Sequence, residues 1–254
     1  RRARLVHGRP ALPGDDPPDL ARRAARARVL PRRDGHPARH ALAAGDLDFV
    51  TAACLGCRFA TAFRAVTAHG RVRPGDWLAV HGCGGVGLSA VMIGAAMGAR
   101  VLAVDVSAAA LGRARELGAE AAVDGGTDGT ASAIEEITGG GAHVSIDALG
   151  SPALAADSVT CLRRRGRHVQ VGLLPGGPVP LPMDLVIARE LEIYGSHGMA
   201  ARDYPAMLRM VADGTLRPGL LVGEVIELGQ VGQALAAMDK PGSGAGMTVV
   251  SPAG

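Results

Sequence analysis

The sequence has very few aromatic residues, since Phe, Trp and Tyr make up 2% of its 254 residues. A buried core in this chain must therefore be built from Ala, Val, Leu and Met. The length is sufficient for one large domain or two small ones, each with a core of its own.

Cysteine is also scarce, with four residues, at positions 54, 57, 83 and 161. Four scattered cysteines do not make the disulfide framework of a secreted domain. The first residues also lack the charged and then apolar pattern of a secretory signal. Both absences favour the reducing cytoplasm, and we expect Cys83 and Cys161 to be small buried residues.

Residues 1–45 lack Glu, Lys, Phe, Tyr, Ile and Thr, but they contain 11 Arg and 4 Asp. They show no sustained apolar period of a helix or a strand. We expect a disordered basic tail, although a coding strand read out of frame would produce the same composition. An arm that binds nucleic acid or a membrane surface is the alternative. We expect neither partner, because the other 209 residues carry 20 acidic and 16 basic groups.

The stretch Trp77 to Ser107 carries the strongest pattern in the chain. Trp77–His81 is a short apolar run, and Gly82, Gly84 and Gly87 then form a G-x-G-x-x-G turn. An apolar helix and a second apolar strand follow. A strand, a glycine turn and a helix in this order are typical of a dinucleotide-binding site.

Each part of this stretch has a physical role in holding a dinucleotide. Gly82 permits the tight turn, Gly84 lets the backbone approach a pyrophosphate, and Gly87 lets helix and strand pack closely. The free N–H groups of the helix N-terminus bind the anion. Asp105, 18 residues beyond Gly87, is expected to accept hydrogen bonds from the ribose hydroxyls and to repel a 2′-phosphate. The sequence therefore predicts NAD rather than NADP.

A membrane span is the alternative for Leu78–Ala99, which has no charged residue apart from His81. Six glycines within that stretch would break a spanning helix. We therefore expect no membrane partner.

Strands and helices alternate in the rest of the chain, which indicates an α/β fold with a doubly wound parallel sheet. His81, His143 and His168 fall at strand positions, where a hydrogen-bonded structural histidine is expected. Arg163–Gly166 is expected to be a solvated basic turn. We predict helices at 108–117, 131–138, 153–162, 204–212 and 231–238, and strands at 121–123, 143–146, 167–171, 191–194, 221–226 and 247–250.

Several stretches in order resemble the zinc-dependent alcohol dehydrogenases of the medium-chain dehydrogenase/reductase superfamily. They are CLGCRFATAF, RPGDWLAVHGCGGVGLSAV, ALGRARELGAEAAVD, GAHVSIDALG, GRHVQVGL and ELEIYGSHG. The resemblance covers residues 46–254. It implies a Rossmann NAD-binding domain at 60–195 and remnants of a second, GroES-like catalytic domain at 46–59 and 196–254.

The resemblance also implies roles for individual residues. Cys57 matches a ligand of the catalytic zinc, and Thr61 matches a residue that packs against the nicotinamide. The remaining matches are the pyrophosphate turn (Gly82, Gly84, Gly85, Val86 and Gly87, with Val86 also behind the nicotinamide), the ribose anchor (Asp105), the adenosine side (Ala148 and Leu149) and further nicotinamide contacts (Val171 and Leu173).

The chain departs from the family before Cys57, where it lacks another cysteine ligand, a Gly-His-Glu motif and a four-cysteine zinc lobe. The resemblance implies hydride transfer between an alcohol and NAD, giving an aldehyde or ketone, with zinc as the family's metal and a homo-oligomer as its assembly. We expect turnover to be impaired in this chain. A zinc-independent quinone or enone reductase, and a non-catalytic NAD-binding module, are the alternatives.

Overall fold

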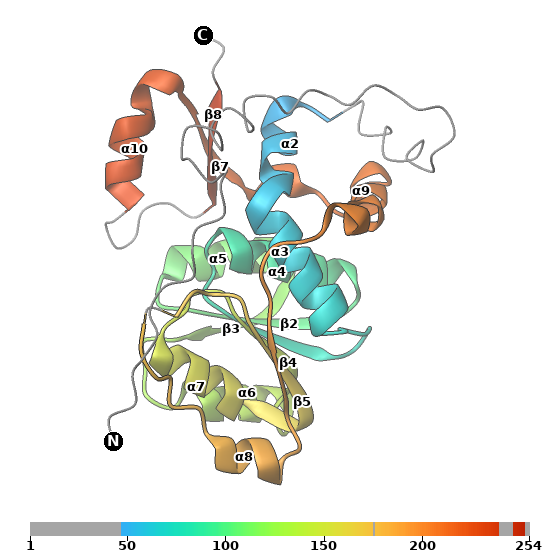
Figure 1. Ribbon diagram of the computed structural model, residues 1–254, viewed down its shortest axis with the longest axis vertical. Coiled ribbons are helices and arrows are strands. Elements are labelled where there is room, and N and C mark those ends of the chain that lie inside the picture. The colour runs from blue at the N-terminus through green and yellow to red at the C-terminus, as the bar shows by residue number, and fades with distance from the viewer. Residues whose placement is uncertain (1–46, 175, 239–245, 252–254) are drawn as a thin grey trace, which may run out of the picture. The chain divides into compact units, whose positions relative to one another are not determined.

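In a computed structural model, six strands form one parallel sheet in the order β3-β2-β1-β4-β5-β6 (Figure 1). The structure describes residues 47–174, 176–238 and 246–251, so the predicted tail at 1–45 lies outside the described residues. The expected doubly wound sheet is confirmed. The strands are Trp77–His81 (β1), Arg100–Asp105 (β2), Ala119–Asp124 (β3), Ala142–Asp147 (β4), Leu162–Gln170 (β5) and Glu192–Gly195 (β6).

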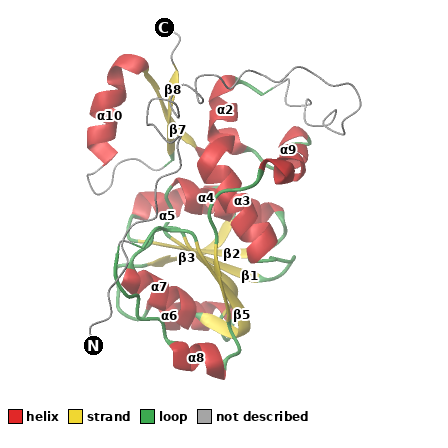
Figure 2. Cartoon of the chain, in the orientation of Figure 1, coloured by secondary structure: helices red, strands yellow, loops and turns green. Residues whose placement is uncertain are grey.

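Helices cover both faces of this sheet (Figure 2). Side chains alternate along β1, so that Leu78 and Val80 join one apolar cluster while Trp77 and Ala79 join another. The first cluster includes residues of α4 and α5, and the second includes residues of α6 and α7. The helices on the two faces are Gly85–Ala96 (α4), Ala108–Glu116 (α5), Thr130–Thr138 (α6) and Pro152–Thr160 (α7).

A helical stretch from Phe49 to His69 packs against α4. It consists of α2 (Phe49–Cys54), a π-helical turn (Leu55–Phe59), α3 (Ala60–Arg64) and a second π-helical turn (Ala65–His69). The side chain of Asp48 accepts a hydrogen bond from the Thr51 N–H and caps its start. Gly56, with φ −64° and ψ −124°, produces a kink. By length and hydropathy this stretch could cross a membrane, but half of its apolar window is buried within the protein, as expected for a core helix.

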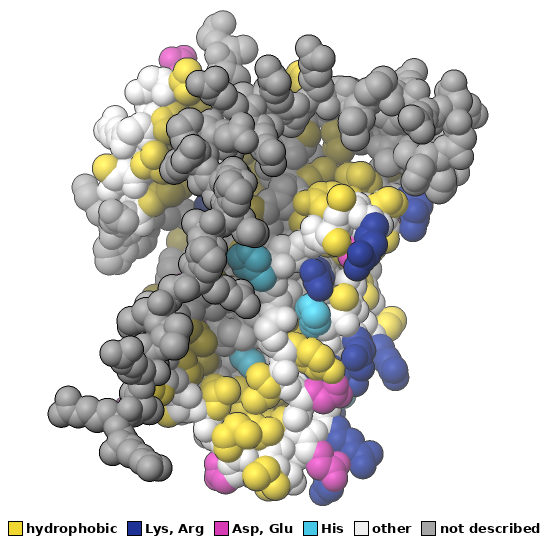
Figure 3. Space-filling model, viewed as in Figure 1, with side chains coloured by type: hydrophobic (Ala, Val, Ile, Leu, Met, Phe, Trp, Pro, Cys, Tyr) yellow, Lys and Arg dark blue, Asp and Glu magenta, His cyan; other side chains and the backbone are white. Residues whose placement is uncertain are grey.

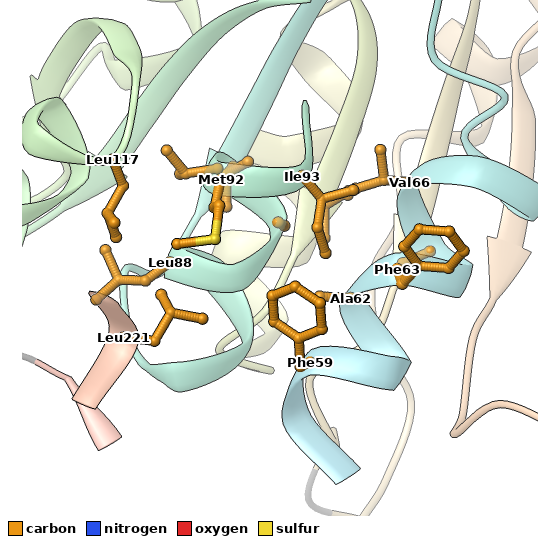
Figure 4. Packing of buried hydrophobic residues seen from close by; sticks show 14 of the residues in the cluster. Phe59, Ala62, Phe63, Val66, Leu88, Met92, Ile93, Leu117 and Leu221 are labelled. Carbon is orange, nitrogen blue, oxygen red and sulfur yellow. The ribbon is translucent and has the colours of Figure 1, made fainter. Parts of the chain in front are cut away.

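The core between this stretch and α4 is formed by a few large side chains. Phe59 points toward Ile93 and its neighbours on α4, and Phe63 lies beside Val66 in the same apolar cluster (Figure 4). Phe59 and Ile93 are both fully buried. Two of the three Phe, Phe59 and Phe63, together with Trp77, are buried, whereas Phe49 is exposed, and aliphatic side chains fill most of the core.

A second, two-stranded parallel sheet is formed by β7 (Val222–Glu227) and β8 (Met247–Ser251). Two helices accompany it in the sequence, α9 (Tyr204–Ala212) and α10 (Val231–Met238). Both helices begin and end at the predicted residues. The assignment of these segments to a GroES-like domain stays a prediction.

The expected basic turn at Arg163–Gly166 is wrong, because β5 already begins at Leu162. Register along β4 jumps from the pair Ala142 with Leu162 to the pair Val144 with Arg167. The intervening residues form a bulge, and Arg165 has φ 61° within it. Strand pairing continues on either side of the bulge. The local sequence contains only arginines and a glycine at this point, which is why it indicated a turn.

The short helix α8 (Met183–Ala188) was not predicted. None of its side chains is fully buried, so its sequence has no strong apolar periodicity to reveal it. The face of the molecule in Figure 3 shows hydrophobic side chains gathered over α8, and arginines mixed with acidic side chains along one side.

Replacing Phe59 by Ala should lower the free energy of unfolding by about 3–5 kcal/mol, because it leaves a cavity against α4. Urea unfolding followed by circular dichroism measures this change. Phe49→Ala is the matched control, since Phe49 is 95% exposed, and it should change stability by less than about 0.5 kcal/mol. Equal effects of the two substitutions would contradict the packing described above.

Candidate cofactor site

The glycine turn between β1 and α4 depends on one left-handed glycine and one close backbone approach. Gly82 has φ 88°, a conformation that favours glycine. A Cβ on Gly87 would lie 1.7 Å from the carbonyl oxygen of Gly82, so no side chain fits at this position. The turn and the first turn of α4 therefore lie directly against each other.

The N-terminus of α4 is open to a ligand. Gly84 is its N-cap and provides no side-chain hydrogen bond to the first N–H groups of the helix. A Cβ built on Gly84 would meet no atom within 4 Å. Unsatisfied N–H groups facing open space form a binding site for an anion such as a pyrophosphate.

Asp105 joins the end of β2 to this turn. One of its carboxylate oxygens accepts a hydrogen bond from the Cys83 N–H at 2.6 Å, and the other accepts from the Ser107 N–H at 2.8 Å. A carboxylate can accept about four hydrogen bonds. Asp105 therefore orients the turn and retains acceptor capacity for the hydroxyl groups of a ribose.

A cavity of about 80 Å³ lies beside Asp105 and brings together three predicted site residues, namely Gly82, Asp105 and Leu149. His81 and Asp157 also line it. The shape follows from the parallel sheet, because the carboxyl ends of β1, β2 and β4 meet at this edge. Ligands of doubly wound folds bind at this edge of the sheet.

The histidines behave differently from one another. His168 is within 3.2 Å of the hydroxyls of Ser145 and Ser158 and of the Gln170 side chain, as predicted for a structural histidine. His81 is fully buried, and its Nδ1 has no hydrogen-bond partner among the described residues. Burial lowers the pKa of His81 to about 4, so its imidazole is neutral at pH 7.

A second hollow, of about 740 Å³, brings together Gly84, Gly85, Val86 and Ala148. Arg58 lines the same hollow and was missed from the sequence. Its Cδ lies 2.6 Å, and its Nη1 3.1 Å, from the position that a Cβ on Gly85 would occupy. The side chain of Arg58 thus lies over the first residue of α4.

Arg58 has no ion pair with an acid of the described residues, and it is the single charged residue of the stretch VTAACLGCRFATAF. That isolation in an apolar segment was the available sequence signal. A guanidinium beside an uncapped helix N-terminus adds a full positive charge to the helix dipole. The combination suits a diphosphate.

The residues predicted to contact the nicotinamide, apart from Val86, do not line either of these two hollows. Thr61 is buried in α3, and Val171 is half-buried, with its N–H donating to the carbonyl of Asp147. Leu173 is exposed. The loops after β4 and β5 are nevertheless in close contact, since a Cβ on Gly172 would lie 2.3 Å from the Gly150 nitrogen.

The side chains present do not fit a zinc ion. Cys57 is exposed and lines a hollow of about 280 Å³. Within residues 47–174, 176–238 and 246–251, no three His, Cys, Asp or Glu side chains are grouped so that they could hold a metal. Three protein ligands are the usual minimum of a catalytic zinc site. In the described part of the chain, therefore, Cys57 lacks the companions that would form one.

All four cysteines are free thiols, and three of them are buried. Burial raises the pKa of the Cys83 and Cys161 thiols to about 12 in each case. Neither thiol forms a reactive thiolate at neutral pH. The prediction that Cys83 and Cys161 are small buried residues is confirmed.

Comparison with known proteins agrees with this geometry. A family model described as zinc-binding dehydrogenase matches residues 85–213. An alcohol dehydrogenase of Geobacillus stearothermophilus is 31% identical over 195 residues, which are 77% of this chain and 56% of that protein. The chain thus spans little more than half the length of the curated relatives it matches.

Solved structures show the same similarity. The alcohol dehydrogenase of the hyperthermophilic archaeon Aeropyrum pernix has a TM-score of 0.72 at 32% identity, covering 82% of this chain and 60% of that one. An NAD-dependent alcohol dehydrogenase has a TM-score of 0.74 at 29% identity, with the same coverage of 82% and 60%.

Replacing Gly84 by Ala should weaken NADH binding by about tenfold or more, because the new Cβ fills the space next to the helix N-terminus where a pyrophosphate would lie. Fluorescence titration with NADH measures the effect. Gly112→Ala, at another open helical glycine, should leave binding unchanged. Unchanged affinity in the Gly84 variant, with its fold intact, would place the dinucleotide elsewhere.

Replacing Arg58 by Gln should also weaken NADH binding about tenfold, through loss of the positive charge over α4. The loss should shrink as salt concentration rises, since screening already weakens this interaction in the unchanged chain. Arg115→Gln, an exposed arginine of α5, is the control with the same change of charge. Equal affinities of the two variants would remove Arg58 from the site.

Proposed function

Because the chain belongs to the zinc-binding dehydrogenase family, we propose that its described residues form the NAD-binding part of an oxidoreductase that transfers hydride between an alcohol and NAD. The observation that carries the proposal is the glycine turn, which opens onto the uncapped N-terminus of α4 beside Asp105. The names of the similar proteins, alcohol dehydrogenases that include an NAD-dependent one, support the same reaction class.

In this proposal the residues of the site bind and orient the cofactor. The N–H groups of α4 and the Arg58 guanidinium hold the pyrophosphate at Gly84. Asp105 accepts hydrogen bonds from the adenosine ribose, and Leu149 and Ala148 flank the adenosine. Val86, Thr61, Val171 and Leu173 are assigned to the nicotinamide side. When bound, NAD supplies the hydride acceptor, and the protein supplies orientation and charge.

We propose the alcohol substrate and its aldehyde or ketone product for the whole protein, and not for the described residues alone. The described residues contain no group of ligands for zinc, and we assign no step to a metal. We expect these residues by themselves to bind NAD with little or no turnover.

A second candidate, a zinc-independent reductase of the same superfamily, is favoured by the isolation of Cys57 among the described residues. Metal analysis of the full chain separates the two candidates. Zinc bound in stoichiometric amount would favour the alcohol dehydrogenase, and reduction of a quinone or enone by metal-free protein would favour the reductase.

Compartment and assembly are part of the same proposal. Four free thiols suit the reducing cytoplasm. Self-association is supported by β6, the edge strand of the six-stranded sheet, where Ile193 is exposed, and by α8, where Ile187 is exposed. Sedimentation of the full chain over a range of concentrations would show whether it associates.

The cofactor assignment predicts tighter binding of NADH than of NADPH, because the carboxylate of Asp105 would repel a 2′-phosphate. Asp105→Asn removes the negative charge. The dissociation constant for NADPH divided by that for NADH should therefore fall by about tenfold. Fluorescence titration with each nucleotide measures the ratio. Asp213→Asn, at an exposed helix end, is the control. Absence of NADH binding to the unchanged chain would overturn the proposed function.

A further inference from the structure

A basic hollow of about 240 Å³ lies at the edge of the large sheet opposite the cofactor site. It is formed by the segment before β1, the start of β4 and the bulge of β5. Because all six strands are parallel, these amino ends lie away from the carboxyl ends that carry Gly82 and Asp105. Five arginines, one histidine and one aspartate line the hollow.

Three of the five arginines have carboxylate partners outside the hollow. Glu190 pairs with Arg164 at 3.3 Å and with Arg165 at 2.8 Å. Glu192 pairs with Arg167 at 3.0 Å. These pairs hold the bulge of β5 in place and neutralise two of its three charges.

The other two arginines, Arg73 and Arg163, have no acidic partner among the described residues. Asp76, the acid within the hollow, accepts a hydrogen bond from the backbone N–H of Arg73 at 2.9 Å. When Asp76 and the two glutamates are counted against the five arginines, two positive charges remain in excess.

The hydrogen bonds of His143 leave two donors facing each other. Its Nδ1 accepts from the Trp77 N–H at 2.9 Å, so in the neutral ring the proton is on Nε2. That Nε2 lies 2.8 Å from Nη1 of Arg163, which can only donate. The closest carboxylate oxygen, on Asp76, is 3.8 Å away. Burial and the neighbouring Arg163 lower the pKa of His143, and Asp76 opposes this effect. The lowered pKa favours the neutral ring.

We propose that this hollow binds a phosphate-class oxyanion, either inorganic phosphate or the phosphate group of a small metabolite. One oxygen accepts from both His143 Nε2–H and Arg163, which satisfies the two opposed donors. Arg73, which also lines the hollow, donates to another oxygen. A phosphate carries a charge of about −1.5 to −2 at pH 7, which largely balances the excess positive charge. A guanidinium group can donate two parallel hydrogen bonds to two phosphate oxygens.

The site lies apart from the proposed cofactor site and is formed by different residues. Its ligand is held by side chains at the amino ends of strands, whereas the dinucleotide site uses N–H groups and Arg58 at α4. Binding at the two sites can therefore be measured separately, and failure of one assignment leaves the other untouched.

The test is calorimetric titration of the full chain with sodium phosphate at constant ionic strength, repeated with glycerol 3-phosphate. Saturating NADH is present, and an Arg58→Gln chain is titrated in parallel, so that phosphate at the glycine turn is not counted. We expect saturable binding with one site per chain. Tighter binding of the ester than of inorganic phosphate would identify a phosphorylated metabolite as the ligand, and the reverse order would identify the free ion.

Arg163→Gln and Arg73→Gln should each weaken the binding by about tenfold or more, while Arg115→Gln should leave it unchanged. Arg73 is exposed, so its variant should keep the fold even if the Arg163 variant does not. Absence of saturable phosphate binding, or equal binding by all three variants, would overturn the proposal. Binding of a DNA duplex without binding of phosphate or its ester would likewise overturn it.

Discussion

The close contact at Gly87 is the constraint on which the cofactor edge of this protein depends. A side chain there would collide with the carbonyl oxygen of Gly82, so the turn after β1 and the first turn of α4 can lie together only around a glycine. The Gly82 N–H donates to the Val104 carbonyl at 2.8 Å, and Asp105 accepts from the next N–H. These bonds join β1, α4 and β2 into one rigid unit that presents the helix N-terminus.

Charge is distributed between the two edges of the sheet in a way that parallel topology favours. At the carboxyl edge, the positive end of α4 and Arg58 face one hollow, with Asp105 beside them. At the amino edge, arginines gather in and around the β5 bulge. Helices that return between parallel strands direct their C-terminal, negative ends toward that edge, where cationic side chains are stabilised. Glu190 and Glu192 pair with three of these arginines and leave Arg73 and Arg163 available.

One helical stretch carries both Cys57 and Arg58. Cys57, which the sequence resemblance predicts to be a zinc ligand, and Arg58, which lies over α4, are adjacent residues just after the kink at Gly56. Phe59, the next residue, is buried against α4. A kinked and anchored helix therefore holds Arg58 at the cofactor hollow and Cys57 in a second hollow that Arg58 also lines. The cofactor edge needs no metal for its geometry, because backbone contacts and buried apolar side chains hold it.

The local pattern of the sequence was sufficient for most elements and for the glycine turn. Apolar runs, capping residues and glycines act over a few positions, so β1, the cap at Ser107 and the helices α9 and α10 could be predicted from nearby residues alone. Tertiary structure decided what distant residues do together. The β5 bulge depends on its register with β4, and α8 has no fully buried side chain to mark it in the sequence. Arg58 meets Gly85 across 27 positions, and Arg163 meets His143 across 20. Such contacts depend on how the chain folds back on itself, and no local periodicity records them.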